Sequence, residues 1–123
     1  DFRCGITGDP LKYFHHMIPS ELKTILEEHP LTLLYFSTPT CNVCKVLRPR
    51  VEALLQEEPP WHFQYMNTEE SMEIAGQHLI FAVPTLLLMA DGREITRLSR
   101  HFGMHELEQP VRRYAKLFKQ AEL

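Results

Sequence analysis

Two cysteines separated by two residues, Cys41 and Cys44, lie where the pattern predicts that a strand ends and a helix begins. The apolar run Leu31–Ser37 has β-branched and aromatic members and is bounded by Pro30 and by turn residues at 38–40, which is typical of a buried strand. After Cys41, apolar residues recur at helical spacing for about four turns. The chain must therefore fold so that a sheet strand passes directly into a helix that carries both thiols at its start.

The rest of the pattern predicts alternating helices and strands. We expect strands over residues 31–37, 61–67, 85–90 and 93–98, and helices over residues 20–29, 41–57, 69–78 and 105–123. Ser20 is the expected N-cap of the first helix, and Pro110 is expected to delay the regular part of the last helix to about Gln109. Asp91-Gly92 predicts a hairpin between the last two strands. The order predicts an α/β fold whose first strands are parallel and whose last pair is antiparallel.

Length and charge exclude several classes of protein. With 123 residues the chain fits one domain, and 44% apolar with 24% charged residues is ordinary globular composition. The net charge of -3, without a basic stripe, argues against a nucleic-acid partner. The longest apolar run, around residues 83–90, contains Pro84 and is shorter than the roughly 20 residues that a membrane span needs. We therefore expect neither nucleic acid nor membrane as a partner.

The first residues differ in character from the rest. Residues 1–16 lack periodicity, and His15-His16 directly precede Met17. A cloning site placed before a start codon often leaves such a His-Met junction. We expect residues 1–16 to be the remnant of an expression tag and residues 17–123 to form the domain. The alternative is a native N-terminal extension that adds to an edge strand of the sheet.

The cysteine count points to redox or metal chemistry. Cys4, Cys41 and Cys44 are too few for a disulfide-stapled scaffold. A cysteine at a helix N-terminus faces unpaired backbone N–H groups and the positive end of the helix dipole, which together can lower the thiol pKa from about 8.5 to roughly 3.5–7.5. Cys41 would then attack a substrate disulfide as the thiolate, and Cys44 would attack Cys41 and release the product.

Two other interpretations of the cysteine pair remain open. The thiols could be inert, or they could be half of a zinc site. The chain has no second cysteine pair, and four of its seven histidines have no fixed ligand spacing: His62, His78, His101 and His105. We therefore expect neither a metal nor a cofactor.

Several motifs in order are those of a known family. Leu33-Leu34-Tyr35-Phe36 is followed by Cys41-Asn42-Val43-Cys44-Lys45, and Pro49 comes five residues after the second cysteine. Val83-Pro84-Thr85-Leu86-Leu87-Leu88 and Asp91-Gly92 follow. On these residues the chain resembles the thioredoxin family over about residues 18–120. The resemblance implies the thioredoxin fold, with a central mixed sheet of four to five strands and helices on both faces.

The resemblance also implies which residues do the chemistry. It makes Val83–Pro84 a cis peptide bond beside Cys41, where the Val83 backbone would pair with an extended substrate segment. It assigns catalysis to Cys41 and Cys44, and substrate binding to Thr40, Asn42, Val43, Val83, Pro84 and Arg100.

The departures from the family pattern lie at the same site. Asn42-Val43 replaces the usual glycine and proline, Thr40 replaces a tryptophan, and Ser99-Arg100 replaces a glycine. Tyr35 and Tyr65 stand in place of a buried aspartate and its lysine, as expected of a coupled change. The group that helps to deprotonate the second cysteine could then be a water, Tyr35 or a nearby carboxylate.

The resemblance implies a thiol–disulfide oxidoreductase that acts on protein disulfides. The implied electron donor is a thioredoxin reductase or another dithiol donor, and we expect a cytoplasmic monomer. The alternative is a binding module, a thioredoxin-fold adaptor that keeps its cysteines without broad turnover.

Overall fold

The computed structural model describes residues 17–121, and the expectations for residues 1–16, Cys4 included, lie outside the described residues. Four helices and four strands make up this part of the chain. In order they are α1 (Pro19–Glu28), β1 (Leu31–Ser37), α2 (Asn42–Gln56), β2 (Trp61–Asn67), α3 (Met72–Gln77), β3 (Thr85–Ala90), β4 (Arg93–Ser99) and α4 (Met104–Ala121).

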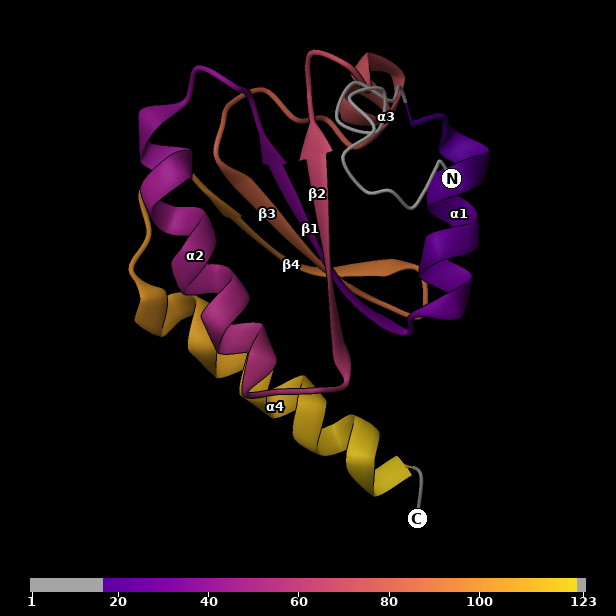
Figure 1. The fold of residues 1–123 in the computed structure, drawn as a ribbon. Helices are drawn as coiled ribbons and strands as arrows, with labels where there is room; N and C mark the ends of the chain where they lie inside the picture. The colour runs from indigo at the N-terminus through magenta and orange to yellow at the C-terminus, as the bar shows by residue number, and fades with distance from the viewer. Residues whose placement is uncertain (1–16, 122–123) are drawn as a thin grey trace, which may run out of the picture.

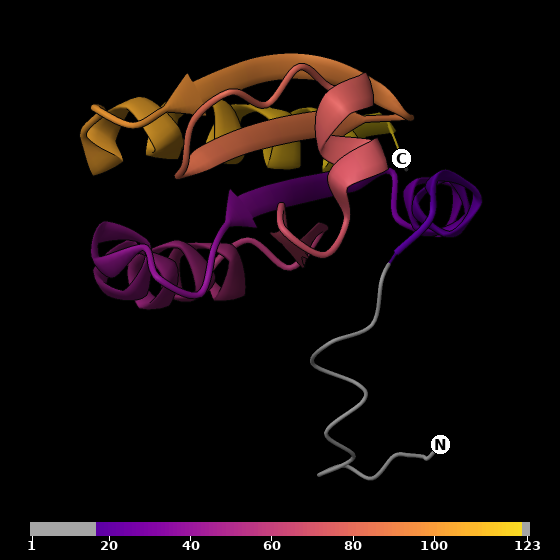
Figure 2. The same ribbon diagram turned by 90° about the horizontal axis from the view of Figure 1, so that it is seen from above.

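The four strands form one mixed sheet in the order β2-β1-β3-β4. β1 and β2 are parallel and joined through α2, whereas β3 is antiparallel to both β1 and β4. Seen from above, β4, β3 and β1 follow one another across the sheet (Figure 2). The predicted mixed α/β sheet is therefore confirmed, with four strands in the described part of the chain.

The helices cover the sheet on two sides, with α2 and α4 on one face and α1 and α3 on the other (Figure 1). Alternate side chains of a strand point to opposite faces, so Leu33 and Tyr35 pack toward α2 and α4 while Leu34 and Phe36 pack toward α1 and α3. Every residue of β1 is buried. A continuous apolar run is what a central strand covered on both faces requires.

The start of α1 differs from the prediction. The helix begins at Pro19, whose missing N–H costs nothing in the first turn, and Ile18 is the N-cap. The Ile18 N–H donates to the Glu21 carboxylate at 3.0 Å. Ser20 is inside the helix, where its carbonyl accepts from the Thr24 hydroxyl at 3.2 Å. The predicted Ser20 cap is wrong because the helix begins at the proline, which places the N-cap two residues earlier, at Ile18.

The regular part of the last helix begins earlier than predicted. α4 begins at Met104 and continues through Pro110, so the predicted delay to Gln109 is wrong. Leu107 and Val111, on either side of the proline, are fully buried against the sheet. Their burial holds the helix across one missing backbone hydrogen bond.

At the amino ends of β1 and β2, away from the cysteines, two histidine rings stack. The ring centroids of His29 and His62 are 3.8 Å apart at an interplanar angle of 8°. Burial, followed by the charge of His29, lowers the pKa of His62 below its usual 6.5, and a hydrogen bond to Gln64 opposes this. Protonation of His62 is therefore less favourable in the folded protein than in the unfolded chain.

This depressed pKa predicts a loss of stability in mild acid. As the pH falls from about 6.5 through the lower folded-state pKa, the unfolded chain takes up the proton first, so the free energy of unfolding decreases. His62→Phe keeps a ring for stacking and removes the titration. Urea unfolding between pH 5 and 8, followed by circular dichroism, is expected to show a shallower pH dependence in this variant. Identical slopes in both proteins would contradict the prediction.

Candidate active site

Cys41 and Cys44 form a disulfide at the start of α2, with their Cα atoms 5.2 Å apart. Cys41 is the N-cap of the helix, and its Sγ accepts a hydrogen bond from the Cys44 N–H at 3.1 Å. Cys44 is only 3% exposed, whereas Cys41 is partly exposed. The sulfur that a partner can reach is thus the one that receives the backbone N–H and faces the positive end of the helix dipole.

The turn between β1 and α2 presents three of the predicted substrate-binding residues. The Cys41 N–H donates to the Thr38 carbonyl at 3.2 Å, which closes the turn. Thr40, Asn42 and Val43 are all exposed next to Cys41 in the chain. They are therefore placed where a partner that approaches Cys41 would meet them.

The remaining predicted residues reach the same edge of the sheet from β3 and β4. Phe36 pairs with Thr85, which places Pro84 level with the end of β1, and the Val83–Pro84 peptide bond is cis. The Pro84 carbonyl accepts from the Arg100 N–H at 2.8 Å. Arg100 itself is exposed and has a positive φ of 58°.

A buried tyrosine lies beneath the inner cysteine. Tyr35 has no exposed surface, and its hydroxyl donates to the Cys44 carbonyl at 2.7 Å. Burial raises the pKa of Tyr35 to about 12, although the positive charge of Arg48 opposes this. Tyr35 is therefore a protonated hydrogen-bond donor at neutral pH. It does not serve as the base that deprotonates Cys44, which was one of the possibilities that the sequence left open.

Next to Cys44 lies a small cavity of about 120 Å³ with two cationic residues in its wall. The Arg48 guanidinium is 4.4 Å from the Tyr65 ring centroid and 5.4 Å from that of Phe63. None of the lining residues is a carboxylate: Tyr35, Ser37, Thr38, Pro39, Cys44, Lys45, Arg48 and Tyr65. Sequence reasoning missed Arg48, although its position one helical turn after Cys44 is the signal that could have found it.

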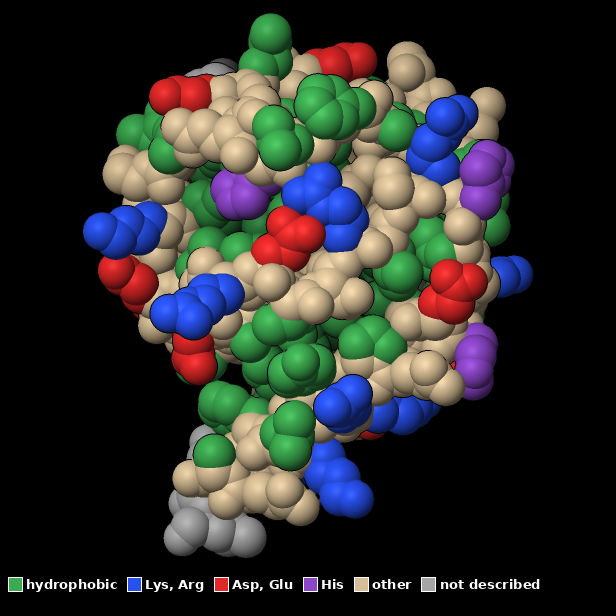
Figure 3. Space-filling model, turned by 180° about the vertical axis from the view of Figure 1, so that it is seen from behind, with side chains coloured by type: hydrophobic (Ala, Val, Ile, Leu, Met, Phe, Trp, Pro, Cys, Tyr) green, Lys and Arg blue, Asp and Glu red, His purple; other side chains and the backbone are tan. Residues whose placement is uncertain are grey.

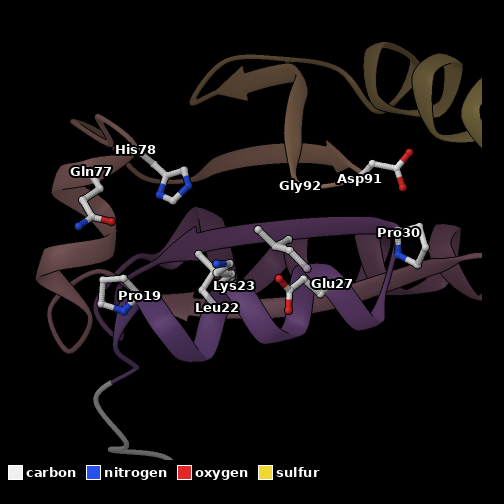
Figure 4. Close-up of a pocket in the computed structure, with 10 residues that line it drawn as sticks. Pro19, Leu22, Lys23, Glu27, Pro30, Gln77, His78, Asp91 and Gly92 are labelled. Carbon is white, nitrogen blue, oxygen red and sulfur yellow. The ribbon is translucent and has the colours of Figure 1, made fainter.

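A larger cavity, of about 510 Å³, lies elsewhere. It runs along α1, from Pro19 beside the end of α3 to Pro30 beside the β3–β4 turn (Figure 4). The Asp91 N–H donates to the Pro30 carbonyl at 2.8 Å, so this turn is at the end of the sheet opposite the cysteines. The cavity is therefore separate from the disulfide.

Exposed apolar side chains lie next to the cysteines on α2 and in the segment between α3 and β3. Val43 and Val46 of α2 are 61% and 65% exposed, and in the segment between α3 and β3 Leu79 and Phe81 are 59% and 88% exposed. Figure 3 shows hydrophobic side chains at the top of the back face, over this segment, and basic and acidic side chains interspersed below it. Such apolar groups on a surface are typical of contacts with other proteins.

Residues 17–121 have neither the side-chain cluster of a metal site nor a helix suited to a bilayer. This part of the chain has no group of three or more histidine, cysteine, aspartate or glutamate side chains placed to hold a metal ion. None of its helices is both long and apolar enough to span a bilayer.

A cysteine pair at the start of the helix after β1, with a cis-proline at the same edge of a β2-β1-β3-β4 sheet, defines a thioredoxin-fold protein of the thiol–disulfide oxidoreductase class. The family model described as Thioredoxin matches residues 14–113, and the chain belongs to the thioredoxin family. The resemblance inferred from the motifs is thereby confirmed.

Individual relatives agree with this assignment. The chain is 31% identical over 98 residues to the thioredoxin-like protein YdfQ of Bacillus subtilis, covering 80% of this chain and 88% of the relative. It is 27% identical over 79 residues to thioredoxin-1 of Saccharomyces cerevisiae, covering 64% and 77%. Among solved structures, Fasciola hepatica thioredoxin superposes with a TM-score of 0.72 at 26% identity, covering 80% of this chain and 95% of that one.

Proposed function

We propose that this protein reduces or exchanges disulfide bonds in other proteins through Cys41 and Cys44. The observation that carries the proposal is the asymmetry of the pair, since Cys41 is partly exposed at the helix N-terminus and Cys44 is buried behind it. An exposed thiolate can attack a partner, and a buried second thiol is protected from side reactions until it is needed.

The exchange proceeds in two steps. The Cys41 thiolate attacks one sulfur of the substrate disulfide, forms a mixed disulfide and expels the other sulfur as a thiolate, which takes up a proton. Cys44 then loses its proton and attacks the Cys41 sulfur. The second substrate sulfur leaves and is protonated, so the substrate is reduced by two electrons and the protein ends as the Cys41–Cys44 disulfide.

Polypeptides are the substrates that this surface favours. The exposed Val43, Val46 and Phe81 offer apolar contact to a protein partner. We propose that the Val83 backbone pairs with an extended segment of the substrate in strand-like fashion. Side chains that border the same edge would contact the substrate beside it: Thr40, Asn42, Pro84 and Arg100.

The proposal needs a donor to restore the dithiol. A thioredoxin reductase or another dithiol donor would reduce the Cys41–Cys44 disulfide. The protein itself would act as a monomer in the cytoplasm. The exposed Arg100 and Thr40 in place of the usual glycine and tryptophan would make the recognition of the donor specific to this surface.

A second candidate function is that of a partner-binding adaptor with little turnover. The observation that favours it is the replacement of a buried carboxylate by Tyr35, whose hydroxyl is engaged with the Cys44 carbonyl and does not act as a base. An adaptor would bind its partner through exposed apolar side chains such as Val43 and Val46, whether or not the cysteines are present.

One assay separates these functions. Reduction of insulin by dithiothreitol, followed by turbidity, is expected to be accelerated by the wild-type protein and not by the Cys41→Ser/Cys44→Ser double variant. A wild-type protein without catalysis, together with partner binding that survives in the double variant, would replace the oxidoreductase by the adaptor.

A further inference from the structure

The cavity beside Cys44 raises the question of how the inner cysteine loses its proton. The cavity volume of about 120 Å³ has room for a few water molecules, each of which occupies about 30 Å³ in the liquid. Its wall contains the inner cysteine, hydroxyl groups and two cations. A thiol that must ionise beside two cations and no carboxylate differs from one that hands its proton to a buried base.

The charged and titratable groups near Cys44 come from three elements. They are Lys45, Arg48 and Glu52 of α2, Tyr35 of β1 and Tyr65 of β2. Glu52 does not line the cavity. It forms an ion pair with Arg48 at 3.3 Å, and the Glu52 and Arg48 side chains are 40% and 42% exposed. Arg100 and His101 follow β4, beyond Pro84 at the same edge of the sheet. Only cations and phenols therefore border the cavity.

Arg48 is the better placed of the two cations. Lys45 is exposed, whereas the Arg48 side chain, 42% exposed, lies over the Tyr65 and Phe63 rings in the cavity wall. The Arg48 charge opposes the rise in the pKa of Tyr35, while the charge of Glu52 adds to that rise. The Tyr35 hydroxyl is itself 2.7 Å from the Cys44 carbonyl oxygen. Arg48 and Cys44 line the same cavity, one helical turn apart, so the charge of Arg48 faces the cavity beside the residue that must ionise.

We propose that Arg48 is the positioning residue of the resolving step, whose positive charge stabilises the Cys44 thiolate so that this thiol ionises to water in the cavity without a carboxylate base. The proposal rests on the proposed oxidoreductase function. In the mixed disulfide, Cys44 gives its proton to cavity water. The thiolate attacks the Cys41 sulfur, the bond between Cys41 and the substrate breaks, and the departing substrate thiolate takes up a proton from solvent.

The test isolates the resolving step with a neutral probe. Reduced protein carrying Cys4→Ser, so that only the pair reacts, is mixed with dithiodipyridine in a stopped-flow instrument at pH 5 to 10. The first thiopyridone is released when Cys41 attacks the probe. The second is released when Cys44 resolves the mixed disulfide, and the pH midpoint of this second phase reports the pKa of Cys44.

Arg48→Met is expected to raise this midpoint by about one pH unit, the lower end of the range for losing a nearby opposite charge. A thiolate of higher pKa is intrinsically more nucleophilic, with a Brønsted coefficient of about 0.4–0.5. The second phase should therefore become about threefold slower at neutral pH and about threefold faster on the alkaline plateau. A packing defect would not speed the reaction at high pH.

Matched variants sharpen the result. Arg48→Lys keeps the charge and should keep the midpoint, and Arg50→Met removes an exposed arginine of the same helix and should leave the profile unchanged. Glu52→Gln removes the counter-charge and should lower the midpoint. Arg48→Gln provides the same comparison if the methionine variant fails to fold, as judged by circular dichroism.

Two results would overturn the inference. One is an Arg48→Met or Arg48→Gln midpoint equal to that of the wild type, and the other is an equal shift in Arg48→Lys, which would assign the effect to packing. A wild-type protein that releases only the first thiopyridone would instead contradict the proposed function, because no intramolecular disulfide then forms.

Discussion

A Cys44→Ser variant is expected to stop after the first step of exchange and to stay covalently joined to its substrate. Cys44 is 3% exposed and has the only sulfur within the described residues placed to attack Cys41. A serine hydroxyl does not form a disulfide, so the mixed disulfide at Cys41 persists. In the dithiothreitol assay, insulin reduction should fall to near the uncatalysed rate. When the reduced variant is mixed with insulin in the absence of dithiothreitol, non-reducing electrophoresis should show a covalent complex, which later addition of dithiothreitol reduces.

Cys41→Ser is the matched control for this trap. It also loses catalysis, but it should form no complex because the remaining thiol is buried. Mass spectrometry of tryptic peptides identifies which cysteine is joined to the substrate, in a Cys4→Ser background that excludes the third thiol. A complex through Cys44 in the Cys41→Ser protein, with none in Cys44→Ser, would reverse the two roles.

The strands were the most predictable part of the fold. The bounds of β1, β2 and β3 agree with those expected from the sequence, because each is a short apolar or alternating run preceded by proline. Pro30, Pro60 and Pro84 stand directly before these strands, where a missing N–H is tolerated and a helix cannot continue. Local chemistry alone therefore sets where each strand begins.

Helix starts were less predictable because they depend on competing local interactions. At α1, a serine after a proline has the preferred cap chemistry, yet the Glu21 carboxylate bonds to the Ile18 N–H and the helix starts earlier. At α4, Pro110 should disfavour the first turns, but burial of Leu107 and Val111 against the sheet prevails. Tertiary packing outweighs the local preference in the second case.

The candidate site also has a part that the sequence predicts and a part that it does not. The cysteine pair and its position at a strand-to-helix junction follow from spacing along the chain. The roles of Tyr35 and Arg48 do not, because they depend on where a hydroxyl and a guanidinium point across three elements. The sequence could show that the family's charged pair is replaced by two tyrosines. It could not show that an arginine lies over one of them.

Trp61→Ala is expected to reduce the free energy of unfolding by about 3–5 kcal/mol, the typical cost of truncating a buried tryptophan. Trp61 begins the edge strand β2 and is 6% exposed within the cluster that joins the sheet to α2 and α4. Its indole Nε1–H donates to the Val111 carbonyl at 2.8 Å, 50 residues along the chain. The variant therefore leaves a cavity and breaks a tie between β2 and α4, which urea unfolding followed by circular dichroism measures.

Two variants separate the contributions of the buried indole and of surface charge to the contact between β2 and α4. Trp61→Phe keeps a ring and loses the N–H donor, so its cost should be about 1–2 kcal/mol. Arg112 of α4 pairs with Glu57 and Glu58, which precede β2, at 3.0 and 2.8 Å, but its side chain is 47% exposed. Arg112→Ala should therefore cost far less than Trp61→Ala, because solvent screens surface ion pairs. Equal losses from Arg112→Ala and Trp61→Ala would mean that charge, and not the buried indole, holds α4 to the sheet.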